Sequence, residues 1–263
     1  MSKRKVLLVI DPSKRDNNAL ERIGGILKRL SSASDFEVVT LITTNLDGIK
    51  KESSSVSVNK EWIDELIDTI AKSGQKYSIE VSWARDWADT LLEHIEKHET
   101  NFSILPFYDH RAANTLSDQK WKFLRNTKTP VLLTNGRRED ASNIILAAIK
   151  TQDPDYEKAN QKVLNLVAEL AKRVGSEIHI VNAYDGSLDY PDRGKILQMT
   201  NIDNERVHIE EGSPKKVLRD LAKKLNADAI YIANNQHKGI TARLRGNTVE
   251  KILEATDCDI VMV

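Results

Sequence analysis

Short runs of valine and isoleucine alternate with longer segments of helical periodicity along the chain. This alternation constrains the fold most, because strands joined by helical crossovers run parallel and need helices on both faces of their sheet. The pattern predicts an α/β fold built from doubly wound parallel sheets. In the first half we expect strands at residues 6–10, 37–43, 78–83, 102–107 and 130–134, and helices at 17–30, 60–72, 86–98 and 117–125.

The same order begins again after a polar stretch at residues 135–140, which contains Asn-Gly and is typical of a linker. We therefore predict two domains of five strands each, residues 1–138 and residues 139–263. In the second half we expect strands at residues 144–149, 177–183, 207–211, 229–233 and 259–263, and helices at 156–174, 214–225 and 248–255.

Equivalent positions in the two halves keep nearly constant separations, with one step between them. Ile10 aligns with Ile149, 139 positions later, whereas Trp83 aligns with Glu211 after 128 positions. A single deletion between the second and third strands of the second half explains the step, as duplication of one domain predicts. We expect residues 185–206 to lack the helix that the first half carries there. The alternative, two unrelated units that share this order by chance, stays open.

Composition excludes several classes of partner. Lysine plus arginine and aspartate plus glutamate each total 39, so no net charge favours nucleic acid or an anionic membrane. The apolar runs are far shorter than the roughly 20 residues of a membrane span, and we expect no secretory signal. A single cysteine, Cys258, fits a reducing compartment, so we expect a cytoplasmic protein.

Several motifs follow one another in a fixed order, among them Gly212-Ser213-Pro214 and the segments 225–232 and 246–253. Together they resemble the universal stress proteins, and their order along the chain carries the resemblance more than any one of them. Gly212-Ser213-Pro214 is similar to the turn that begins the helix after strand three, and it suits a tight turn, an N-cap and a first helical residue. Other segments that resemble the family are 225–232, 246–253, 258–263 and 129–134, while 10–12, 81–85 and 121–125 resemble its tandem, E-type members.

The resemblance implies a fold, a role and a mode of association. It implies the Rossmann-like strand order 3-2-1-4-5 in each domain, and a role in survival under stress rather than a defined reaction. In the family, two such domains pair through their last strands, so we expect the two halves to pair within the chain, and a homodimer stays open. The activity implied is binding of a small ligand or protein partner, neither of which the sequence identifies.

Some universal stress proteins bind ATP through a loop of the form Gly-x-x-Gly-x9-Gly-Ser/Thr, whose glycines let the backbone approach phosphates. In the second half, Ala233 and Gln236 stand at the first two glycine positions. Gly246 matches the third, followed by Asn247, and Thr248 lies one place beyond the expected hydroxyl. The motif is degenerate.

The family also places an aspartate at the end of strand one, near the adenine. Lys150 stands at that position in the second half, whereas the first half keeps Asp11 but has no glycine between residues 75 and 135. We therefore expect no bound ATP and no other cofactor. The alternative is a nucleotide-binding module that uses the partly retained loop. Its contacts would be Asp11, Gly239, Gly246, Asn247 and Thr248, with Lys238, Arg243 and Arg245 as cations for an anion, unless these form a solvated basic loop.

Other chemistry finds little support in the sequence. His94 and His98 are four residues apart on an expected helix, but no local pattern supplies a third metal ligand, so we expect exposed helix residues and no metal site. His179 and His208 fall on expected strands and are interpreted as packed or hydrogen-bonded core residues. Cys258 is interpreted as a packing residue. Phosphate-loop, dinucleotide and hydrolase motifs do not occur, and we predict no catalytic residues.

Overall fold

The computed structural model describes residues 4–10, 36–43, 64–65, 67–68, 71–72, 76–82, 86–106, 118–134, 142–234, 252, 256 and 258–263. The chain divides into two compact units, one that contains the elements from β1 to β5 and one that contains those from β6 to β10. We call them unit 1 and unit 2. No helix among the described residues is long and apolar enough to cross a membrane.

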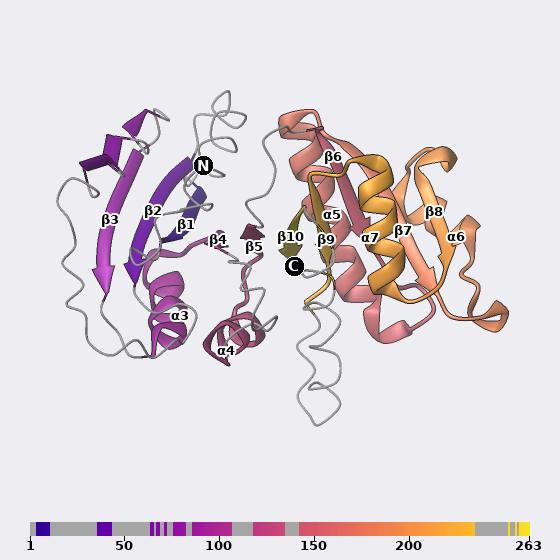
Figure 1. The fold of residues 1–263 in the computed structure, drawn as a ribbon, viewed down its shortest axis with the longest axis horizontal. Helices are drawn as coiled ribbons and strands as arrows, with labels where there is room; N and C mark the ends of the chain where they lie inside the picture. Colours follow the sequence, from indigo (N-terminus) through magenta and orange to yellow (C-terminus); the bar gives the residue numbers. More distant parts are fainter. Residues whose placement is uncertain are drawn as a thin grey trace. The chain divides into compact units, whose positions relative to one another are not determined.

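Unit 1 is a parallel sheet with the strand order β3-β2-β1-β4-β5 (Figure 1). Helices α3 and α4 lie side by side, and the rings of Trp87 and Phe123 meet between them at a centroid distance of 6.4 Å. The described elements are β1 (Arg4–Ile10), β2 (Phe36–Thr43), β3 (Lys76–Ser82), α3 (Trp87–His98), β4 (Phe102–Pro106), α4 (Asp118–Asn126) and β5 (Val131–Thr134).

Unit 2 repeats this sheet, with the order β8-β7-β6-β9-β10 and all strands parallel. Each unit therefore has the order 3-2-1-4-5 when its own strands are counted, which confirms the predicted fold class. The described elements are β6 (Ile144–Ala148), α5 (Glu157–Val174), β7 (Glu177–Tyr184), α6 (Arg193–Thr200), β8 (Val207–Glu211), α7 (Pro214–Leu225), β9 (Ala229–Ile232) and β10 (Asp259–Met262), with short 3-10 turns at Pro154–Tyr156, Ser187–Asp189 and Asn204–Arg206.

Strand pairing reproduces the separations read from the sequence. Val6 pairs with Val38 in unit 1 as Ile145 pairs with Ile178 in unit 2. After the second strand, the separation between equivalent residues of the two units becomes smaller. Thr40 pairs with Ile79 in unit 1, and the equivalent pair in unit 2 is Ile180 with Val207. Residues at equivalent places in the two sheets thus follow one pattern with a single shortening.

The shortened segment of unit 2 contains a helix, so the expectation that residues 185–206 lack one is wrong. Helix α6 begins after Asp192, whose side chain accepts a hydrogen bond from the backbone N–H of Lys195, an N-cap signal that the sequence analysis overlooked. Ile196 of α6 is fully buried, and the helix contacts β8. The shortened segment of unit 2 therefore keeps a helix beside β8.

Helix boundaries follow the expected chemistry, with one exception. Gly175 ends α5 in the left-handed conformation, with φ at 69°, where a residue without Cβ avoids strain. Gly212 turns the chain before α7 with φ at 134°, and Pro214 is the first helical residue. Ser213 occupies the N-cap position, but its side chain makes no capping hydrogen bond.

Asp228 fixes the start of unit 2's central pair of strands. Its buried carboxylate accepts hydrogen bonds from the backbone N–H groups of Ser142 and Asn143, at 2.8 and 2.9 Å. In unit 1, Asn101 holds the corresponding place before β4 and accepts one such bond from the N–H of Lys5, at 2.9 Å. Charge-assisted bonds to backbone amides are among the stronger hydrogen bonds in proteins.

We predict that Asp228→Ala lowers the free energy of unfolding by about 2 kcal/mol, because the backbone amides of Ser142 and Asn143 lose a charged acceptor whose side chain is buried. Asp228→Asn, which mimics Asn101, should cost less. Asp220→Ala, at an exposed position of α7, is the matched control, with an expected change within about 0.5 kcal/mol. Urea unfolding measures all three, and an equal loss in the Asp228→Ala and Asp220→Ala variants would contradict the assignment.

His179 and His208 of unit 2 bond to each other, as expected; His179 is buried and His208 is half-buried. His179 Nδ1 lies 2.9 Å from His208 Nε2, and the two rings stack at 17°. His179 Nε2 also lies 2.6 Å from a carboxylate oxygen of Glu177. Cys258 is buried at the start of β10, in keeping with a packing role. The histidine pair joins β7 to β8 through side chains.

Burial lowers the pKa of His208 from its ordinary value of 6.5, and His179, Lys224 and Arg193 lower it further against the opposing charge of Glu210. The unfolded chain therefore binds a proton more readily, so the free energy of unfolding should fall as the pH drops below about 6.5. Equilibrium unfolding at pH values from about 7.5 to about 5.5 checks this. The His208→Gln variant should show a shallower fall, and an unchanged slope would contradict the prediction.

Candidate functional site

The nucleotide contacts predicted from the sequence lie outside the described residues and stay predictions. This holds for Asp11, Gly239, Gly246, Asn247, Thr248, Lys238, Arg243 and Arg245. The described residues instead bring together two other groups of polar side chains. One lies at the carboxyl ends of β6 and β7 in unit 2, and the other lies between β3 and α3 in unit 1.

Lys150 lies just beyond the carboxyl end of β6, where the resemblance implies an aspartate. Its backbone N–H donates to the side-chain oxygen of Asn160 at 3.1 Å, and its carbonyl accepts from the same amide at 2.8 Å. The ammonium group lies 3.1 Å from a carboxylate oxygen of Asp153 and 4.8 Å from the ring centroid of Tyr156. This part of the edge therefore carries a cation whose charge Asp153 balances.

Asn182 brings the end of β7 into the same region. Its fully buried side-chain amide lies 2.9 Å from Thr151 Oγ1 and 2.8 Å from Gln152 Nε2. Gln152 Nε2 also lies 3.3 Å from the carbonyl oxygen of Ala183. We call Lys150, Thr151, Gln152 and Asn182 the carboxyl-edge cluster.

The carboxyl-edge cluster suits recognition better than proton transfer. Amide, hydroxyl and ammonium groups donate and accept hydrogen bonds, but the cluster pairs no nucleophile with a base. In open α/β sheets, ligands bind beyond the carboxyl ends of the strands. The arrangement can therefore orient a polar ligand at this edge of unit 2.

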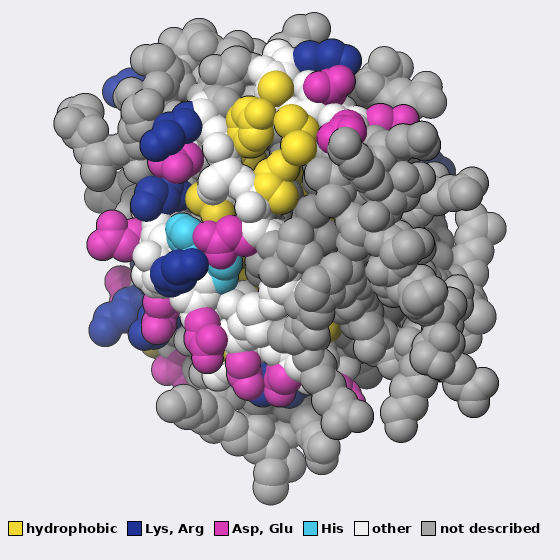
Figure 2. Space-filling model, turned by 90° about the vertical axis from the view of Figure 1, so that its left-hand side faces the viewer, with side chains coloured by type: hydrophobic (Ala, Val, Ile, Leu, Met, Phe, Trp, Pro, Cys, Tyr) yellow, Lys and Arg dark blue, Asp and Glu magenta, His cyan; other side chains and the backbone are white. Residues whose placement is uncertain are grey.

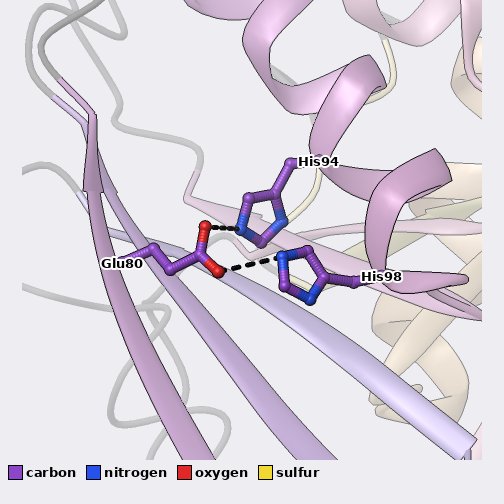
Figure 3. Close-up of side chains that lie close together, drawn as sticks. All are labelled: Glu80, His94 and His98. Carbon is purple, nitrogen blue, oxygen red and sulfur yellow. Dashed lines mark hydrogen bonds and ion pairs between the residues drawn. The ribbon is translucent and has the colours of Figure 1, made fainter.

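The second group joins two histidines of α3 to an acidic residue of β3 (Figure 3). His94 Nε2 lies 3.1 Å from Glu80 Oε2, and His98 Nε2 lies 2.9 Å from Glu80 Oε1. One potential ligand atom of each residue lies within 4.8 Å of the others. Because His94 is only 5% exposed, the expectation of two exposed helix residues is wrong for it. We call Glu80, His94 and His98 the Glu-His-His cluster.

The charges of this cluster follow from its surroundings. Burial and the neighbouring His98 lower the pKa of His94, and the attraction of Glu80 does not offset them, so the ring favours its neutral form. Burial raises the pKa of Glu80, but His94, Lys97 and His98 together lower it more. A carboxylate thus faces neutral imidazole nitrogen.

Solvent reaches the Glu-His-His cluster from one side. The side chain of Glu80 is 36% exposed and that of His98 is 20% exposed. Figure 2 shows histidine side chains at the surface of this face, among acidic and basic side chains. Lys97 is one of the basic neighbours, with Nζ at 3.3 Å from Glu80 Oε2.

Sequence reasoning missed Glu80, Gln152 and Asn182. Glu80 could have been noticed as a charged residue within the apolar pattern of a strand, 14 positions before His94. Gln152 lies four positions after the end of a central strand, and Asn182 interrupts an apolar strand, so both signals place polar groups near the ligand-binding edge of a parallel sheet.

Comparison with known proteins finds similarity to universal stress proteins. Residues 192–263 match the model of the Universal stress protein family. Universal stress protein E of Escherichia coli (strain K12) is 24% identical in a comparison that covers 99% of this chain and 93% of that protein. Universal stress protein A homolog 1 of Coxiella burnetii is 27% identical in a comparison that covers 45% of this chain and 94% of that protein.

Solved structures show the same fold. A putative universal stress protein from Pseudomonas aeruginosa superposes with a TM-score of 0.76 at 20% identity, covering 99% of this chain and 93% of that one. A universal stress protein from Archaeoglobus fulgidus has a TM-score of 0.67 at 17% identity, with 99% and 96% covered. The comparisons confirm the predicted resemblance: along nearly its whole length, this chain is similar to universal stress protein E.

Proposed function

We propose that this chain acts in stress survival by binding a ligand or a protein partner, without turnover, and that its nucleotide sites are degenerate in both halves. The carboxyl-edge cluster is the observation that carries the proposal. It lies where an open α/β sheet binds its ligands, and it offers hydrogen-bonding groups without an acid–base pair. Similarity to universal stress protein E along nearly the whole chain supports the stress role.

Lys150 supports the loss of nucleotide binding in unit 2. In the family's usual site an aspartate near the adenine accepts hydrogen bonds, whereas an ammonium group can only donate. Lys150 is also held by Asp153 and by the backbone contacts of Asn160, so its place is fixed beside β6. Lysine in place of aspartate at position 150 therefore gives the carboxyl edge of unit 2 a hydrogen-bond donor where the family's usual site has an acceptor.

The proposal can be tested in cells that lack the gene. We expect the double variant Thr151→Val, Gln152→Ala to lose protection under the stress that the wild-type protein counters, because two polar side chains leave the carboxyl-edge cluster. Gln161→Ala removes an exposed amide of α5 that bonds only to its helix neighbour Asn165 among the described contacts, and it should protect like the wild type.

Purified protein provides the second arm of the test. Incubation with ATP should release phosphate no faster than a blank without protein, since no described residue of the cluster can activate water as a general base. Protein-dependent phosphate release, or full protection by the double variant at normal expression, would contradict the proposal.

A further inference from the structure

We propose that Glu80, His94 and His98 bind a divalent transition-metal ion, with zinc as the ion that fits best, and that the bound ion links α3 to β3. The inference is independent of the proposed function, because the Glu-His-His cluster belongs to unit 1 and shares no residue with the carboxyl-edge cluster. No local sequence pattern defines such a site, since the strand and the helix supply its ligands together.

The spacing of the three side chains fits a common metal ion. Ligands about 2.0–2.1 Å from a tetrahedral zinc ion lie about 3.4 Å from one another. One ligand atom of each residue lies within 4.8 Å of the others, and the two carboxylate oxygens of Glu80 lie 3.1 and 2.9 Å from the histidine nitrogens, so side-chain rotations can bring three ligand atoms around one ion. The histidines are one helical turn apart, which puts both rings on the same face of α3.

The contact between His98 and Glu80 is incompletely explained without an ion. His98 Nε2 is a buried atom 2.9 Å from Glu80 Oε1, yet it has no aligned hydrogen bond among the described residues. Two ligands of one metal approach each other in this way, because their lone pairs point to a third atom between them. Buried polar groups that lack a hydrogen bond call for such an explanation.

The donor set selects the class of ion. Imidazole nitrogen suits zinc and its neighbours in the first transition row, whereas magnesium and calcium prefer sites built from oxygen alone. Two histidines and one carboxylate leave the fourth tetrahedral position of zinc open. Because Glu80 and His98 are partly exposed, water can occupy that position and the ion can enter from solvent.

Two features of the surroundings set the expected strength of metal binding. Lys97 shares the carboxylate of Glu80, and since its side chain is 66% exposed it can move away when the ion arrives. His94 Nδ1 is buried, and no residue in the described part of the chain supplies the outer hydrogen bond that orients most metal-bound histidines. Loss of such support weakens binding by about 10–100-fold, so we expect reversible binding.

Calorimetric titration of the chelator-treated full-length protein with Zn²⁺ tests the proposal. We expect one ion per chain at this site and a rise in the melting temperature, with no comparable effect of Mg²⁺ or Ca²⁺. Glu80→Gln and His98→Gln should each weaken this binding by at least about tenfold, since each removes one of three ligands. Circular dichroism confirms that each variant is folded.

Two further variants separate this site from other histidines, and a third tests the competing cation. His208→Gln in unit 2 and His110→Gln, whose residue lies outside the described part of the chain, should bind Zn²⁺ like the wild type. Lys97→Gln should bind it more tightly, because the competing cation is gone. The proposal is overturned if the wild type binds no Zn²⁺, if Glu80→Gln and His98→Gln bind it unchanged, or if His110→Gln alone abolishes binding.

Discussion

The buried central strand of each sheet, β1 in unit 1 and β6 in unit 2, is the constraint on which the rest of the structure depends. Leu7, Leu8 and Leu146 are fully buried, so these strands are covered on both faces. Such strands can be joined in parallel only by crossover segments, and all of them then end at the same edge. This is why Lys150, which follows β6, and Asn182, which lies in β7, belong to one cluster.

Most of the fold could be predicted because its signals are local. Gly175 marks the end of α5, and Pro214 marks the start of α7. The apolar face of each helix is also a local signal, and the repeated order of strands gives the topology. Residues 185–206 were harder. Pro191 and Gly194 suggest a loop, yet the N-cap at Asp192 and the burial of Ile196 against the sheet stabilise a helix of eight residues. Tertiary packing here outweighs weak local propensity.

The candidate sites were less predictable because their members are distant in sequence. His94 and His98 are adjacent on one helix face, but Glu80 joins them only once α3 folds back on β3. The burial of His94 depends on the same packing, so a helix pattern alone made it look exposed. Likewise, the replacement of an aspartate by Lys150 was visible in the sequence, whereas its contacts with Asp153 and Asn160 required the fold.

Native mass spectrometry of the purified chain, with and without millimolar ATP, tests most directly the claim that this protein works by binding something other than a nucleotide. The account predicts that added ATP leaves the native mass unchanged. A small ligand retained from the host would appear as a discrete added mass that is lost on denaturation, and its mass would identify the compound. A stoichiometric adduct of one ATP per chain would contradict the account.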